Sequence, residues 1–154
     1  MKAVIIMGSK SDLDYCRKIA ENLSEFGISS ILRVASAHKT PQKVLEIIKE
    51  YEKDDVVFVT VAGRSNALSG FVDANTVRPV IASPPYSDRF AGMDILSSIR
   101  MPSGVAPLLV MEAENTALAV AKIAALTDEK VRERVKNYQD RKKGKIYKAD
   151  EELG

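Results

Sequence analysis

Cysteine, histidine and tryptophan are nearly absent from this sequence, which has one cysteine, one histidine and no tryptophan among its 154 residues. A single cysteine cannot form an internal disulfide, as is typical of proteins that work in a reducing cytoplasm. One cysteine and one histidine are also too few for a metal site built from these ligands. We therefore expect a cytoplasmic protein without a Cys/His metal centre.

Long apolar runs and an excess of either charge are lacking too. The apolar stretch of residues 3–7 is too short for a signal peptide or a membrane span. The 23 basic and 21 acidic residues nearly cancel and are interspersed, which leaves no electrostatic footprint for nucleic acid or an anionic membrane. With 45% hydrophobic residues, we expect residues 1–154 to form a single globular domain with a substantial core.

Five short apolar segments have the character of strands buried on both faces. The strongest is VVFVTVA, which is β-branched and almost entirely apolar. The expected strands are residues 3–7, 28–34, 56–62, 79–82 and 108–111.

Apolar residues at spacings of three and four predict helices between these strands. Gly27 suits the end of the first helix and Pro41 the start of the second. Strands that alternate with helices form a parallel sheet covered on both faces. We predict an α/β fold of the flavodoxin-like, three-layer αβα type, with a five-stranded doubly wound sheet and extra C-terminal helices. The expected helices are residues 13–26, 41–51, 67–72, 89–100 and 115–126, and a last one from about residue 128.

Polar turns follow the first four expected strands. In flavodoxin-like sheets, ligands bind outside the carboxyl ends of the strands, at the switch point between the first and third. The turns expected to meet at this edge are Gly8-Ser9-Lys10-Ser11-Asp12, Ser36-Ala37-His38-Lys39, Gly63-Arg64-Ser65-Asn66 and Ser83-Pro84-Pro85.

The residue types in these turns suit a nucleoside monophosphate and acid–base chemistry. Serines at a helix N-terminus accompany free backbone N–H groups that bind phosphate, and Lys39 and Arg64 could add positive charge. Asp12 is a natural acceptor for ribose hydroxyls. Histidine is the side chain best suited to proton transfer near neutral pH, and His38 is the one histidine in the chain. The pattern predicts a small nucleotide bound beside an imidazole.

Each of these residues also has a simpler interpretation. Ser9 and Ser11 could only cap a helix, and a lone loop histidine such as His38 could be solvated or structural. Lys39 and Arg64 could be ordinary surface charges. The functional interpretation depends on the convergence of these turns at one crevice.

Two familiar uses of this fold are disfavoured. A receiver domain needs a phospho-accepting aspartate at the end of the third strand, where this chain has Ala62 and Gly63. A flavodoxin would have a phosphate loop rich in Ser, Thr and Gly, and aromatic residues that stack on the flavin, whereas the loop here is GSKSD and tryptophan is absent.

Three segments resemble the signatures of the phosphoribosylaminoimidazole carboxylase / N5-carboxyaminoimidazole ribonucleotide mutase family of de novo purine synthesis. They are MGSKSD at residues 7–12, SAHKT at residues 36–40 and MPSG at residues 101–104. The resemblance covers essentially the whole chain, in the right order and spacing.

The segment AGRSNALSG at residues 62–70 separates the two classes of this family. The mutase class carries a GGAAHL-type segment there, with a second histidine, and usually has arginine at the position of Lys39. This chain has neither feature. It therefore resembles class II, which carboxylates aminoimidazole ribonucleotide at C4 with CO2 and uses no ATP, metal, biotin or other cofactor.

The resemblance also implies roles for individual residues. His38 would be the general base that removes the C4 proton. The residues that would hold the ribose 5-phosphate are Ser9, Ser11, Asp12 and Lys39. The residues that would line the CO2 site are Gly63, Arg64, Ser65 and Asn66, and the remaining wall would be formed by Ser36 and the Ser83-Pro84-Pro85 turn.

The family forms homo-octamers or tetramers with active sites shared between subunits. Val131, Val135 and Tyr138 form a stripe in the last expected helix, which could pack on a neighbouring subunit or on its own domain. Three other functions stay open from the sequence: the mutase reaction, a non-catalytic nucleotide-binding module, and a scaffold that acts through the C-terminal helices.

Overall fold

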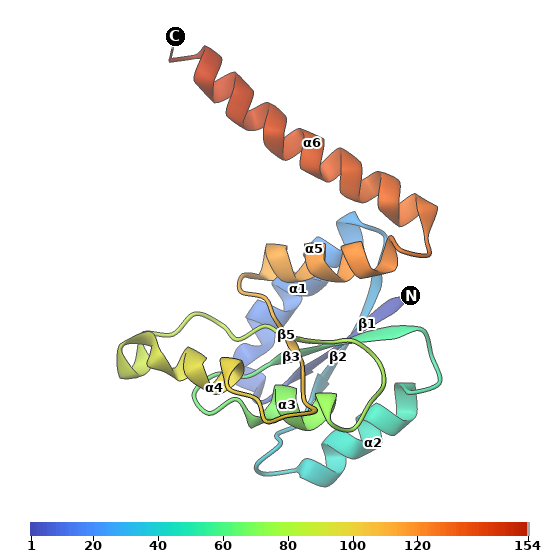
Figure 1. Ribbon diagram of the computed structural model, residues 1–154, viewed down its shortest axis with the longest axis vertical. Helices are drawn as coiled ribbons and strands as arrows, with labels where there is room; N and C mark the ends of the chain where they lie inside the picture. The colour runs from blue at the N-terminus through green and yellow to red at the C-terminus, as the bar shows by residue number, and fades with distance from the viewer. Residues whose placement is uncertain (154) are drawn as a thin grey trace.

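Five parallel strands lie at the centre of the structure, a computed structural model that describes residues 1–153 (Figure 1). The strand order is β2-β1-β3-β4-β5, and every neighbouring pair is parallel. This is the predicted flavodoxin-like topology. The strands are β1 (Lys2–Met7), β2 (Ser29–Val34), β3 (Val56–Val61), β4 (Val80–Ala82) and β5 (Leu108–Leu109).

The central strands β1 and β3 are apolar except for Lys2 at the start of β1 and Thr60 in β3, because both of their faces are covered. All six residues of β3 are buried. Along β1, Ile5 and Met7 belong to the core under α1 and α5, whereas Val4 and Ile6 belong to the core under α2 and α3. The sheet therefore separates two cores that share its central strands.

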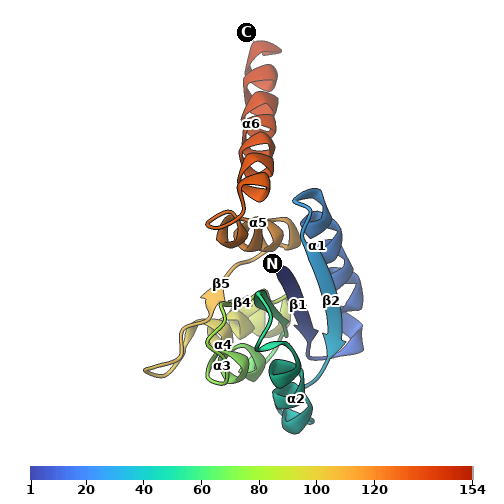
Figure 2. The same cartoon turned by 90° about the vertical axis from the view of Figure 1, so that its right-hand side faces the viewer.

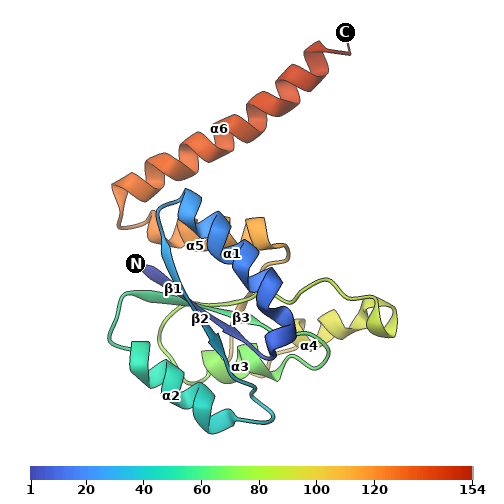
Figure 3. The ribbon, with the colours of Figure 1, turned by 180° about the vertical axis from the view of Figure 1, so that it is seen from behind.

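Helices cover both faces of the sheet, with α1 and α5 on one side and α2 and α3 on the other (Figures 1 and 3). None of the helices within residues 1–153 is long and apolar enough to cross a bilayer. The helical elements are η1 (Lys10–Asp12), α1 (Leu13–Glu25), α2 (Pro41–Tyr51), α3 (Ala67–Asp73), η2 (Arg89–Ile95), α4 (Leu96–Ile99), α5 (Ala113–Ala124) and α6 (Glu129–Glu151).

Two elements are shorter than predicted. The fifth strand has only Leu108–Leu109, and the helix expected over residues 89–100 is the broken turn η2 followed by the single turn α4. Phe90, Ala91 and Gly92 have positive φ values of 52°, 54° and 76° and interrupt the helix. No residue of η2 is buried, so no packed face stabilises a regular helix there.

The apolar stripe of α6 packs on its own domain. Val131, Val135 and Tyr138 are buried in the core of α1 and α5. The Tyr138 ring lies 5.2 Å from that of Phe26, and its hydroxyl donates to Glu114 Oε1 at 2.7 Å. Of the two placements that the sequence left open, the stripe takes the intramolecular one.

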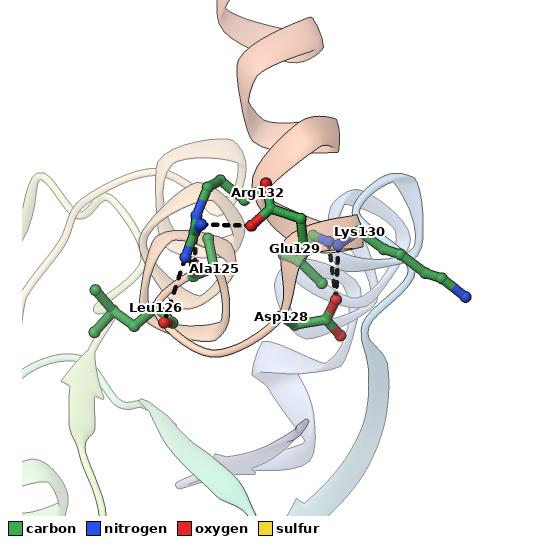
Figure 4. Close-up of polar contacts among 7 residues, drawn as sticks. Ala125, Leu126, Asp128, Glu129, Lys130 and Arg132 are labelled. Carbon is green, nitrogen blue, oxygen red and sulfur yellow. Dashed lines mark hydrogen bonds and ion pairs between the residues drawn. The ribbon is translucent and has the colours of Figure 1, made fainter.

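The turn between α5 and α6 is tied by two charged side chains (Figure 4). The Asp128 carboxylate caps α6 by accepting from the backbone N–H of Lys130 at 2.9 Å. The Arg132 guanidinium donates to the carbonyl oxygens of Ala125 and Leu126 at the end of α5. These contacts set the direction in which α6 leaves the domain, and its C-terminal half extends away from the sheet (Figure 2).

We expect Gly27→Ala to destabilise the fold. Gly27 has a φ of 72°, which costs an alanine about 1–2 kcal/mol, and an added Cβ would also displace the Arg134 guanidinium at the end of its flexible side chain. Urea unfolding at a fixed protein concentration measures the loss. Gly144→Ala is the control, because that position lies within α6 and has open space around it. Alanine there should raise the free energy of unfolding by about 0.5–1 kcal/mol. Equal stability of the two variants would contradict the prediction.

Candidate active site

A cleft of about 630 Å³ opens at the carboxyl edge of the sheet. It lies among the turns that follow β1, β2, β3 and β4, as the fold rule predicts. Most of the predicted site residues line it; the exceptions are Asn66, Ser83 and Pro84. The predicted residues that line it are Ser9, Ser11, Asp12, Ser36, His38, Lys39, Gly63, Arg64, Ser65 and Pro85.

The turn after β1 is organised by its own serines. Ser9 Oγ accepts from the backbone N–H of Ser11 at 3.3 Å and lies 2.9 Å from Ser11 Oγ. The backbone N–H of Asp12 donates to the carbonyl oxygen of Ser9 at 3.1 Å, which closes η1. Burial raises the pKa of the Asp12 carboxyl, against the opposing effect of the Ser11 hydroxyl. The turn thus presents two hydroxyls and a partly desolvated carboxyl to the cleft.

The turn after β2 is closed by Ser36 and Thr40. The N–H of Ser36 donates to Thr40 Oγ1 at 3.0 Å, and the N–H of Thr40 donates back to the Ser36 carbonyl at 2.8 Å. Ser36 Oγ accepts from the N–H of Lys39 at 3.3 Å. His38 and Lys39 lie between these anchors, with exposed side chains at the cleft. A solvent-accessible imidazole and ammonium are thereby held on a defined backbone.

The turn after β3 contains a strained residue. Arg64 has a φ of 60°, which costs a non-glycine residue about 1–2 kcal/mol. Asn66, expected to line the CO2 site, is instead 3% exposed and caps α3: its Oδ1 accepts from the N–H of Ser69 at 3.2 Å. An asparagine directly before a helical pattern is the sequence signal for such a cap. Gly63, Arg64 and Ser65 therefore line the cleft, whereas Asn66 is buried and caps α3.

The turn after β4 has one residue in the wall of the cleft and one residue in the protein core. Pro85 lines the cleft, and Pro84 lines an adjoining cavity of about 310 Å³. Ser83, expected in the wall with them, is buried and lies 3.0 Å from the Tyr15 hydroxyl and 2.6 Å from Thr116 Oγ1. Burial raises the pKa of Tyr15, so this chain of hydroxyls stays protonated. It links α1, β4 and α5 behind the site.

Several residues of the cleft were not found from the sequence. They come from the segment after β4, part of which was predicted to be a regular helix over residues 89–100, and they are Tyr86, Ser87, Asp88, Arg89 and Asp94.

Cys16 takes no part in the cleft. It is fully buried on α1, and burial raises the pKa of its thiol to about 12. The nearby charge of Asp12 acts in the same direction. At neutral pH this side chain is a protonated thiol in the core and not a nucleophile.

Fold and site together define a flavodoxin-like α/β protein with a polar cleft that offers hydroxyls, three cationic side chains and one imidazole. The sequence model of the AIR carboxylase family matches residues 2–145. The chain is 78% identical to the phosphoribosylaminoimidazole carboxylase of Archaeoglobus fulgidus over 99% of this chain and 85% of that protein. It superposes on the crystal structure of Treponema denticola PurE with a TM-score of 0.96 at 48% identity, covering 98% of this chain and 97% of that one.

This chain belongs to the AIR carboxylase (PurE) family, whose enzymes act in purine biosynthesis. The family resemblance noted in the sequence is thereby confirmed. A relative with the other activity also matches: the N5-carboxyaminoimidazole ribonucleotide mutase of Methanocaldococcus jannaschii is 41% identical over 97% of this chain and 95% of that protein. Membership therefore establishes a carboxylase or a mutase, and the choice between them depends on the site.

Proposed function

We propose that this chain carboxylates 5-aminoimidazole ribonucleotide at C4 with CO2 to give 4-carboxy-5-aminoimidazole ribonucleotide. Residues 1–154 act as one catalytic domain of a cytoplasmic homo-oligomer, without ATP, metal or biotin. The observation that carries the choice of reaction is the turn after β3, where Arg64, Ser65 and Asn66 stand in place of the second histidine of the mutase class. The relative at 78% identity, named a phosphoribosylaminoimidazole carboxylase, supports the same choice.

The substrate ring itself explains why no activating cofactor is needed. Its amino group makes C4 the nucleophilic carbon of an enamine, so C4 attacks CO2 and forms the new carbon–carbon bond. C4 then carries both its hydrogen and the carboxylate, and the ring regains aromaticity when that proton leaves. His38 accepts the proton, and returns it in the decarboxylation direction. The exposed imidazole in the cleft is accessible for this transfer.

Two groups of residues in the cleft have different roles. Ser9, Ser11 and Asp12 at the start of α1, with the Lys39 ammonium, hold the ribose 5-phosphate: the two hydroxyls and the cation bind its phosphate, and the Asp12 carboxylate accepts from its ribose hydroxyls. Ser36 supports this group through the backbone of Lys39. The turn formed by residues 63–65 faces the CO2, where positioning matters because so small a substrate offers few contacts.

Exposed apolar surface supports the homo-oligomer. The end of α6 projects from the domain with Ile146 71% and Tyr147 68% exposed (Figure 2). A second apolar surface lies on the segment after β4, beside the cleft. Its exposed members are Tyr86, Phe90, Met93, Leu96 and Ile99. Surfaces of this kind on a small domain mark protein–protein contacts, and the family resemblance assigns them to further copies of this chain, as an octamer or a tetramer.

The choice between carboxylase and mutase is tested by offering the pure protein each substrate separately. We expect turnover of aminoimidazole ribonucleotide that increases with CO2 concentration, and no requirement for the N5-carboxy isomer. The reverse reaction should release CO2 from the product. Turnover of the N5-carboxy compound alone would make the chain a mutase. Ligand binding without exchange of the C4 proton into solvent would make it a non-catalytic module.

His38→Asn should abolish turnover and leave substrate binding intact. Loss of a general base lowers kcat by at least about 100-fold, while the KM for the ribonucleotide should change by less than about threefold. Lys39→Ala is the matched neighbour and should show the opposite pattern, a KM raised roughly tenfold with kcat nearly unchanged. Near-normal turnover of His38→Asn would remove the histidine from the mechanism.

Replacing the exposed apolar pair of α6 should weaken assembly. We expect sedimentation velocity to show an octamer or tetramer for the unmodified chain, and smaller species for Ile146→Ser combined with Tyr147→Ser. Lys145→Ser is the control, since it makes a similar change in the same exposed turn without removing apolar surface. A monomer in the unmodified chain, or unchanged assembly in the double variant, would contradict the role of this surface.

A further inference from the structure

The conformation of the turn after β3 depends on contacts with another segment of the chain. Arg64 has left-handed backbone angles without being a glycine, so neighbouring groups must stabilise that conformation. Both backbone groups of Arg64 are bound by the segment after β4. Its N–H donates to Asp94 Oδ2 at 3.2 Å, and its carbonyl oxygen accepts from Ser97 Oγ at 2.9 Å.

The same segment also fixes Asn66, two residues further along the turn. The N–H of Asn66 donates to Ser97 Oγ at 2.9 Å, and Asn66 Nδ2 donates to Ser98 Oγ at 2.9 Å. Ser97 Oγ in turn lies 2.7 Å from the carbonyl oxygen of Asp94, so the contacts form a connected set. Asn66 and Ser98 are both buried, which makes the loss of any member costly.

Asp94 lies at the boundary of the site. It lines both the main cleft and the adjoining cavity. Its carboxylate therefore accepts from the backbone of the turn after β3 inside the site. A change at Asp94 would act on the turn after β3 and not on the turn after β1, which is closed by its own serines.

We propose that Asp94 and Ser97 are positioning residues of the carboxylation: they hold Arg64 and Ser65 in the conformation that receives CO2, and leave the phosphate-binding residues unaffected. The inference rests on the proposed function, in which residues 63–65 face the CO2. It adds a specific consequence, because the two substrates of the reaction should respond differently to the same substitution.

Steady-state kinetics of Asp94→Ala and Asp94→Asn test this assignment, with each substrate varied in turn. Asp94→Ala should lower kcat/KM for CO2 by roughly 10–100-fold and change the KM for the ribonucleotide by less than about threefold. Asp94→Asn retains an oxygen that can accept from the Arg64 N–H, so it should recover activity to within about threefold of the unmodified chain. Equal losses for both substrates, or an asparagine variant as impaired as the alanine one, would overturn the proposal.

A double-variant cycle adds a second test. Ser97→Ala should produce the same selective loss for CO2. Because both side chains act through one turn, the combined variant should lose clearly less than the product of the two single losses. Multiplicative losses would mean independent roles and would overturn the assignment.

Hydrogen exchange separates failure of this inference from failure of the proposed function. In Asp94→Ala, backbone amides in a peptide spanning residues 62–70 should exchange faster, and those spanning residues 8–12 should not change. If the unmodified chain does not use CO2, the proposed function fails, and this exchange pattern still tests whether Asp94 holds the turn. Unchanged exchange over residues 62–70 would refute the positioning role whatever the reaction is.

Discussion

Burial of β1 and β3 on both faces is the constraint on which the rest of the structure depends. A parallel strand with no exposed face must have neighbours on each side and helices above and below it. Because β1 pairs with both β2 and β3, the chain reverses the direction in which strands are added at this point. The turns after these three strands must then emerge at the same edge. The position of the candidate active-site cleft thus follows from how the core is buried, before any polar side chain is considered.

At this edge the backbone turns are closed locally or by neighbouring segments, which leaves side chains free for a ligand. The turn after β1 uses Ser9, and the turn after β2 uses Thr40, to satisfy backbone groups within the turn itself. The turn after β3 takes its partners from a distant segment, through Asp94 and Ser97. Preorganised donors and acceptors need little rearrangement when a substrate binds or reacts. Such sites therefore stabilise developing charge without a cost in reorganisation.

The sequence predicted the features that depend on burial and on the order of strands and turns along the chain. The strands, their parallel arrangement and the convergence of His38, Lys39 and Arg64 follow from continuous apolar runs and the topology rule. The broken segment η2 was not predicted, because its apolar residues have helical spacing but no core to pack on. Asp94 was missed because it lies in this broken segment, whose path the sequence did not predict. Asn66 was assigned to the cleft by its position in a motif, whereas it is buried, caps α3 and donates through Nδ2 to the distant Ser98.

Backbone strain in this protein gathers at the same edge as the candidate site. Within residues 1–153, the non-glycine residues with positive φ are Arg64 after β3, Phe90 and Ala91 after β4, and Glu112 after β5. Each of these conformations costs stability, and the two fully covered cores of the sheet offset that cost. Two of the strained residues are held by identifiable bonds: Arg64 by Asp94, and Glu112 through its carbonyl, which accepts from Thr116 Oγ1 at 2.8 Å. A rigid sheet whose strained turns are held by bonds to neighbouring segments can position a small substrate that offers few contacts of its own, since the geometry is set before the substrate arrives.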